Sequence, residues 1–204
     1  MARMLRGKTV LLAGGTAELP AALASGLMAA GARVRLPSRD GRVANEEVEA
    51  LYSAAGRIDI LINIVPPVPP AAFFDMSRGA WGGLLSSTLD DAFLWTQAVA
   101  RVMSFSGEQG GIINIVGNMD HPDADVAPFT ELASRGIVVA LTRALAAELA
   151  NRGIQVNAIV GRSARGPGSG EAGFADVVRT AVFLCAAQGT FVSGETIEVG
   201  GSAA

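Results

Sequence analysis

The sequence is poor in the residues that most often carry out chemistry. It holds one lysine (Lys8), one tyrosine (Tyr52), one histidine (His121) and one cysteine (Cys185). A lone cysteine excludes a disulfide within the chain, and its place in an apolar helical run predicts a buried thiol. Because Lys8 and Tyr52 are far apart, the chain has no Tyr/Lys pair four residues apart. The sequence also shows no metal cluster, Walker loop, Gly-x-Ser-x-Gly elbow or internal repeat.

An excess of positive charge and long apolar runs are missing as well. The net charge of −3 gives no electrostatic footprint for nucleic acid or for an anionic membrane. No apolar run approaches the roughly 20 residues that span a bilayer. The N-terminus reaches a strand pattern without the apolar core of a signal peptide. We therefore expect a cytoplasmic protein that binds neither nucleic acid nor membrane.

What the sequence does contain is an alternation of strand and helix patterns. Half of its 204 residues are apolar, which favours a single α/β domain over residues 1–204. The helices predicted at 81–105 and 129–150 carry more apolar residues than one sheet face can cover. The predicted strands are Lys8–Ala13, Ala32–Leu36, Ile58–Val65, Gly111–Gly117, Ile154–Val160 and one within 191–201, and the other predicted helices are Ala21–Ala30, Asn45–Tyr52 and Phe174–Ala187.

Three segments carry a family resemblance. The helix that contains Leu141-Thr142-Arg143-Ala144-Leu145, together with the strand after it, resembles the active-site helix and next strand of the short-chain dehydrogenase/reductases. Asp59–Asn63 is similar to the fourth strand of that family, and Phe191–Gly201 is similar to its last strand. The resemblance implies a Rossmann-like, doubly wound parallel sheet flanked by helices.

The predicted sheet is shorter than the family's. No room remains between Leu36 and Asn45 for the family's third strand and the helix beside it. We therefore predict six strands in the order 2-1-4-5-6-7, in the family's numbering, joined by right-handed crossovers. Arg33–Leu36 should form an exposed edge strand.

The resemblance places mismatched residues at the family's catalytic positions. In the family an Asn anchors a water relay, a Ser positions the carbonyl, a Tyr donates a proton to it and a Lys activates that Tyr. The corresponding residues here are Thr88, Gly117, Glu131 and Arg135. Glu131 and Arg135 have the i,i+4 spacing of an ion pair on a helix. This spacing predicts a structural salt bridge in place of a proton donor.

The loop expected to hold a dinucleotide is also degenerate. A glycine-rich turn leads into a helix at the point where the family binds pyrophosphate, but Glu18 and Pro20 replace the second and third glycines. The Glu18 carboxylate would repel a phosphate. After Asn63, a stiff proline run at 66–70 replaces the family's Ala-Gly turn. We expect no useful binding of NAD or NADP. The residues of this degenerate site are Gly14, Gly15, Thr16, Glu18 and Asn63.

Three functions fit these observations. The first is a non-catalytic subunit that assembles with itself or with an intact reductase through helices 81–105 and 129–150, with Leu94 and Val138 on the exposed faces. The second is a repurposed enzyme without nicotinamide, such as a lyase, isomerase or cyclase. The third is an NAD(P)-dependent oxidoreductase with unusual chemistry. We favour the first, because the losses lie around cofactor and substrate while the apolar helix faces are kept. A repurposed enzyme would draw on Glu131, Arg135, His121 and Asp120.

Overall fold

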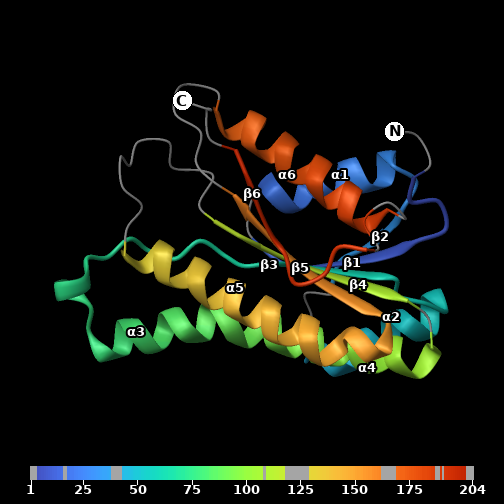
Figure 1. The fold of residues 1–204 in the computed structure, drawn as a ribbon, viewed down its shortest axis with the longest axis horizontal. Coiled ribbons are helices and arrows are strands. Elements are labelled where there is room, and N and C mark those ends of the chain that lie inside the picture. The colour runs from blue at the N-terminus through green and yellow to red at the C-terminus, as the bar shows by residue number, and fades with distance from the viewer. Residues whose placement is uncertain are drawn as a thin grey trace.

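The fold was analysed in a computed structural model. It describes residues 4–15, 18–37, 43–107, 109–117, 129–161, 169–186, 189 and 191–200, with residues 169–172 described by their backbone alone. Six strands and six α-helices alternate along the described chain (Figure 1). The strands are β1 (Thr9–Gly14), β2 (Arg33–Arg35), β3 (Ile60–Ile64), β4 (Gly110–Val116), β5 (Ile154–Gly161) and β6 (Thr196–Val199). The helices are α1 (Glu18–Ala29), α2 (Ala44–Ala55), α3 (Arg78–Leu85), α4 (Asp91–Ser106), α5 (Phe129–Leu149) and α6 (Ser169–Cys185).

The strands form one sheet in the order β2-β1-β3-β4-β5-β6, and every pair is parallel. This order is the predicted one, so the Rossmann-like architecture and the six-strand count are confirmed. β2 forms one edge, as expected for Arg33–Leu36, and β6 forms the other. Parallel strands need a crossover between them, and the helices supply these crossovers.

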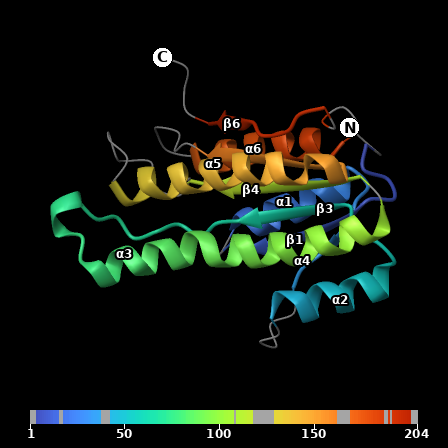
Figure 2. The same ribbon diagram turned by 60° about the horizontal axis from the view of Figure 1, so that its bottom comes forward.

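Helices cover both faces of the sheet. α1 and α6 lie side by side on one face, while α2, α4 and α5 lie on the other (Figures 1 and 2). Because both faces are covered, the central strands are mostly apolar, and β3 reads Ile-Leu-Ile-Asn-Ile with every residue buried. No helix in the described part of the chain is long and apolar enough to cross a membrane.

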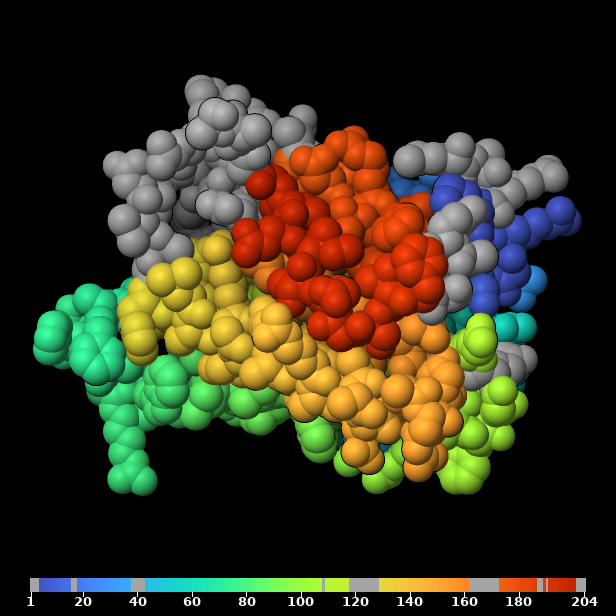
Figure 3. All heavy atoms as spheres, in the orientation of Figure 1, coloured from blue at the N-terminus to red at the C-terminus, as the bar shows by residue number. Residues whose placement is uncertain are grey.

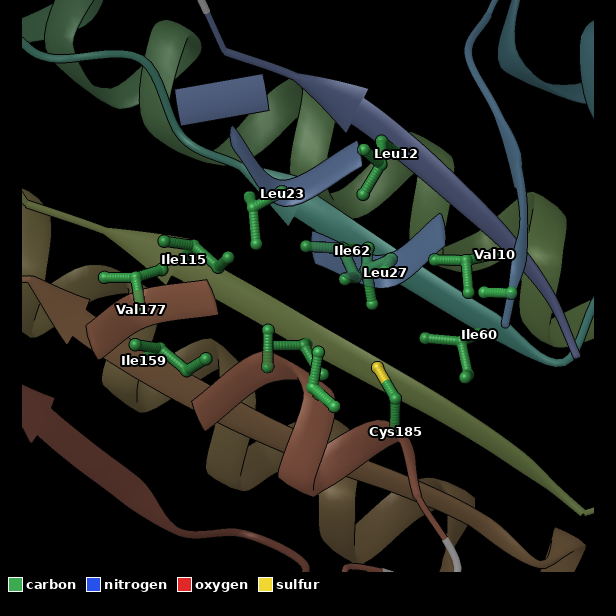
Figure 4. Packing of buried hydrophobic residues seen from close by; sticks show 14 of the residues in the cluster. Val10, Leu12, Leu23, Leu27, Ile60, Ile62, Ile115, Ile159, Val177 and Cys185 are labelled. Atoms are coloured by element: carbon green, nitrogen blue, oxygen red, sulfur yellow. The ribbon is translucent and has the colours of Figure 1, made fainter. Parts of the chain in front are cut away.

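The core beneath α1 and α6 shows how the sequence pattern becomes packing. Leu23 and Leu27 lie one turn apart on α1 and are fully buried against the sheet (Figure 4). Burying a side chain of this size contributes roughly 1.5–3 kcal/mol. Cys185, at the end of α6, lies in the same cluster, as predicted. Its burial raises the pKa of the thiol to about 12.

The helix predicted over Trp81–Phe105 is divided. It begins at Arg78, where the Ser77 hydroxyl accepts a hydrogen bond from the Ala80 N–H at 3.1 Å. It then passes through a π-helical turn at Ser86–Asp90 before continuing as α4. A π turn shifts the register of the following residues and is common at functional sites. The predicted long helical region is therefore confirmed, and the π turn within it was not predicted.

The orientation of α5 corrects a second prediction. Val138 was expected on an exposed face, but it is fully buried with Val65, Val116 and Val160. The buried seam of α5 follows an i,i+4 pattern that includes hydroxyl residues. Its members are Thr130, Ser134, Val138, Thr142, Ala146 and Leu149.

Two element boundaries also differ from the sequence prediction. α1 starts at Glu18, three residues earlier than expected, so Pro20 lies in the first helical turn, where its missing N–H costs little. α6 starts at Ser169, five residues before the predicted start at Phe174.

Candidate functional site

The candidate site lies at the carboxyl ends of β1, β3, β4 and β5, the edge at which open parallel α/β sheets bind ligands. Gly14 ends β1 and Gly15 follows it, with positive φ values of 78° and 76°. A Cβ on Gly14 would overlap the carbonyl oxygen of Ile64. The glycine is therefore required by the close approach of β1 and β3. Thr16 lies outside the described residues.

Little space remains between these two strand ends and the helix beside them. A cavity of about 10 Å³ lies there, which is room for about one water molecule. Gly14, Asn63 and Thr88 are among the residues that line it. Glu18 opens α1 as its only acidic first-turn residue, where a carboxylate is favoured by the helix dipole.

The side chain of Asn63 is buried and hydrogen-bonded to neighbouring side chains. Its Nδ2 donates to Thr96 Oγ1 at 3.0 Å and to Asn114 Oδ1 at 2.9 Å. Asn114 in turn donates from Nδ2 to Thr142 Oγ1 at 2.9 Å. This chain of buried bonds joins β3 and β4 to α4 and α5. Asn63, proposed from the sequence as part of a degenerate cofactor site, thus serves here as a structural link.

Thr88 lies in the π-helical turn and is buried. Its hydroxyl is 3.2 Å from the hydroxyl of Ser134 on α5, and either group can be the donor. The position that holds Asn in the resembled family therefore holds a short hydroxyl side chain, engaged by another side chain. The partner, Ser134, was not identified from the sequence.

Glu131 and Arg135 form the predicted ion pair on α5. Both side chains are largely buried, with 15% of Glu131 and 18% of Arg135 exposed. The same Arg135 nitrogen, Nη2, also donates to the carbonyl oxygen of Gly161 at 3.1 Å. Arg135 therefore ties α5 to the carboxyl end of β5. Its Nε is buried and has no hydrogen-bond partner in the described part of the structure.

Gly117 stands at the position of the family's Ser, directly after β4. Its φ is 135°, which side chains rarely tolerate, and a Cβ there would overlap the Gly161 carbonyl oxygen. The backbone at Gly161 thus leaves no room for a side chain at position 117. Gly161 contacts both Arg135 and Gly117, and no local sequence signal pointed to it.

The structure brings five of the candidate residues together near the carboxyl ends of the strands: Thr88, Ser134, Glu131, Arg135 and Gly117. Asp120 and His121, the other candidates for a repurposed enzyme, lie outside the described residues. In the described part of the chain, no group of His, Cys, Asp and Glu side chains could hold a metal ion.

Comparison with known proteins agrees with this architecture. A family model described as short chain dehydrogenase matches residues 3–163. The chain belongs to the short-chain dehydrogenase family. Among its relatives, the oxidoreductase YohF of Escherichia coli K12 is 37% identical over 113 residues, which cover 55% of this chain but only 44% of YohF. Gluconate 5-dehydrogenase of Gluconobacter oxydans is 30% identical over 199 residues, which cover 87% of this chain and 76% of that enzyme.

A solved structure extends the family match to the whole fold. The gluconate 5-dehydrogenase of Burkholderia cenocepacia, in complex with NADP and tartrate, superposes with a TM-score of 0.79 at 24% identity. The match covers 97% of this chain and 96% of that one. The chain thus has the scaffold of the short-chain dehydrogenase family over its described length.

Proposed function

We propose that this short-chain dehydrogenase is a non-catalytic subunit that acts through assembly. The observation that carries the proposal is the contact of Arg135 with both Glu131 and the Gly161 carbonyl oxygen. At the family's Tyr position stands a carboxylate, Glu131, that is paired with the guanidinium of Arg135. At the Lys position stands a guanidinium engaged with protein groups. No Tyr stands at position 131 for Arg135 to activate.

We infer that the described residues of the site are poorly suited to a nicotinamide cofactor. The cavity lined by Gly14, Asn63 and Thr88 has a volume of only about 10 Å³, and Glu18 adds a negative charge to the helix start that follows the glycine turn. A relative in the family has been solved with NADP, so an oxidoreductase function is the natural alternative. We favour its loss here, because Thr88, Gly117, Glu131 and Arg135 together replace the reacting and positioning groups.

The assembly surface in this proposal is the outer side of α4 and α5. A groove of about 580 Å³ lies between these helices. Its rim includes Phe93 and Phe105, whose side chains are 45% and 91% exposed. Leu94 on α4 is 49% exposed and Leu132 on α5 is 52% exposed. Apolar side chains exposed in this number on neighbouring helices are typical of protein–protein contact surfaces.

The exposed face of α5 also favours close packing of another helix. It carries Gly136, Ala140, Ala144 and Ala147 at helical spacing, and all four are exposed. Small side chains allow two helices to approach closely, and a two-fold axis would bring the same face of each copy together. The partner is therefore a second copy of this chain or another protein with the same helical face, such as an intact reductase.

One observation supports a second candidate, a repurposed enzyme without nicotinamide. The buried, unpartnered Nε of Arg135 is a hydrogen-bond donor without an acceptor, and such groups call for an explanation. An anionic substrate group could accept from it, with Glu131 as the neighbouring base. The double variant Glu131→Gln with His121→Ala addresses this candidate. Loss of the biological activity with assembly and stability intact would make the protein an enzyme.

The assembly proposal is tested by co-purification of the tagged protein from its native host, with mass spectrometry and light scattering on the purified protein. We expect either a homo-oligomer or a complex with a short-chain dehydrogenase that has an intact Tyr/Lys pair. A protein that stays monomeric at micromolar concentration, with no family member bound, would contradict the proposal.

A further inference from the structure

One edge of the sheet offers a position for a further strand. β2 pairs with β1 on one side, and in the described part of the chain no strand pairs with its other side. The longer sheet of the short-chain dehydrogenases has its third strand at this position, and the segment between Leu36 and Asn45 is too short to supply one. In the space-filling view, the blue N-terminal part of the chain, which includes β1 and β2, reaches the surface at the right margin (Figure 3).

The backbone of β2 has hydrogen-bonding groups that point away from β1. The Arg33 N–H donates to the Lys8 carbonyl oxygen at 2.8 Å, toward β1. Because successive residues of a strand turn their backbone groups to opposite sides, Val34 turns its N–H and C=O to the open side. The Val34 carbonyl oxygen accepts there from Arg35 Nη1 at 3.4 Å, which is a long and exposed contact. A strand added at this edge therefore finds a backbone donor and a backbone acceptor in place.

The side chains of β2 divide by charge between the two faces of the sheet. Val34 packs against the core cluster beneath α1 and α6. Since side chains alternate along a strand, Arg33 and Arg35 share the opposite face. Both are exposed, and neither forms an ion pair within the described part of the chain. Their spacing of roughly 7 Å along the strand is also the spacing of alternate side chains on an added strand.

The two arginines determine which kind of strand fits this edge. Opposite charges directly across two strands stabilise the pair, and like charges destabilise it. Pairing of β2 with β2 of a second copy would place arginines opposite arginines, so this charge pattern disfavours self-pairing. Charged residues at a sheet edge protect it from unwanted pairing. Here they exclude basic and identical edges, and they attract a strand with an acid at every second position and an apolar residue on the side of Val34.

We propose that the open edge of β2 binds an extended segment of a partner protein in which acidic residues alternate with apolar ones. The segment takes the position of the missing third strand, bonds through its backbone to Val34 and pairs its acids with Arg33 and Arg35. Strand addition of this kind gains affinity from backbone hydrogen bonds and specificity from alternate side chains. The surface is distinct from the α4–α5 face, and the proposal does not depend on the assembly role argued above.

The test titrates the full chain with a short blocked peptide of alternating Glu and Val while its backbone amides are followed by NMR. We expect the largest shifts at β2 and slower hydrogen exchange at the Val34 amide, because that N–H gains an acceptor. A peptide of alternating Lys and Val is the charge control and should not bind. Absence of binding by the acidic peptide up to millimolar concentration would overturn the proposal.

A second acidic peptide separates strand addition from charge attraction alone. It has the same sequence but carries N-methyl groups on its backbone nitrogens, so it keeps its charge and loses its backbone donors. Its affinity should be lower by about tenfold or more, because no backbone hydrogen bond to the Val34 carbonyl oxygen can form. Equal affinities of the two acidic peptides would show attraction between acids and arginines without strand pairing, and would contradict the proposal.

Charge exchange tests whether the two arginines select the partner. Arg33→Glu with Arg35→Glu should weaken binding of the acidic peptide about tenfold or more, and the peptide of alternating Lys and Val should now bind. The matched control, Arg78→Glu with Arg143→Glu, removes two exposed arginines elsewhere and changes the net charge equally. It should bind the acidic peptide like the unmodified protein. An equal loss in the control, or no binding of the basic peptide to the β2 variant, would refute the proposal.

Discussion

At the scale of single residues, the contact between Gly117 and Gly161 excludes a side chain at position 117. A Cβ there would overlap the Gly161 carbonyl oxygen, and the φ of Gly117 is one that side chains rarely adopt. We predict that Gly117→Ser, which would restore the family's residue, lowers the free energy of unfolding by about 3 kcal/mol or more, from strain and overlap together. Urea unfolding measures the change.

Gly56→Ser is the matched control. Gly56 also has a positive φ, 74°, but nothing lies within 4 Å of a Cβ built there. This variant should lose only about 1 kcal/mol, the cost of the backbone conformation. Equal losses at the two positions would show that the overlap with the Gly161 carbonyl oxygen is not real.

At this scale, the sequence could predict only contacts between residues close together in the chain. The Glu131–Arg135 pair was predictable because i,i+4 spacing on a helix determines it. The bond from Arg135 to Gly161 and the contact between Thr88 and Ser134 join segments far apart in the chain. Such contacts depend on how strands and helices are placed together, which residue spacing alone does not encode.

At the scale of elements, the start of β3 is anchored by a buried acid. Asp59 accepts from the Thr9 N–H at 2.8 Å, from Arg57 Nε at 2.9 Å and from Lys8 at 3.2 Å. Burial disfavours the charged carboxyl, but the bonds from Arg57 and Thr9 and the charge of Lys8 together outweigh it. They lower the pKa of Asp59 below its usual 3.8.

This pKa shift predicts an acid dependence of stability. A carboxyl whose pKa is lower in the folded state stabilises the fold above its unfolded pKa, and this stabilisation is lost as pH falls through the folded pKa. The free energy of unfolding should therefore decline below about pH 4. Asp59→Asn should cost about 1–3 kcal/mol at neutral pH and flatten the acid decline. Asp176→Asn, in an exposed pair with Arg179, should change stability by less than about 0.5 kcal/mol. An unchanged acid profile in Asp59→Asn would refute the assignment.

For helices α4 and α5, the sequence predicted the position of each helix but not the buried face of α5 or the π turn before α4. Both were placed correctly, but the inward face of α5 was not, because its buried seam includes Thr130, Ser134 and Thr142. The hydroxyls of these residues bond to Pro69, Thr88 and Asn114. A helix with apolar residues on every side gives no periodic signal for the face that meets the sheet. The π turn at Thr88 was missed for a similar reason, since residue pattern does not reveal a shifted hydrogen-bond register.

The corrected orientation gives a sharper test of the assembly face. Leu94→Asp combined with Phe105→Asp should yield a smaller, soluble species by light scattering, because both side chains are exposed on α4. Phe191→Asp serves as the control and should keep the original mass. Val138→Asp should instead unfold the protein, because it places a charge in the core. An unchanged mass for the α4 double variant would remove this face from the proposal.

At the scale of the whole molecule, the sequence predicted the architecture better than the site. The strand order followed from the resemblance to the short-chain dehydrogenase/reductases together with right-handed crossovers, and the family match and the solved relative agree with it. Our central claim is that this protein does not catalyse hydride transfer and acts by assembling with another subunit. The claim concerns the cofactor first, because hydride transfer needs a bound hydride carrier.

The most direct measurement is calorimetric titration of the purified protein with NAD⁺, NADH, NADP⁺ and NADPH in turn. We predict no heat of binding beyond dilution at ligand concentrations up to the millimolar range, because Glu18 adds a negative charge beside the glycine turn and Arg135 is engaged by Glu131 and Gly161. A dissociation constant in the low micromolar range for any of the four forms would contradict the account.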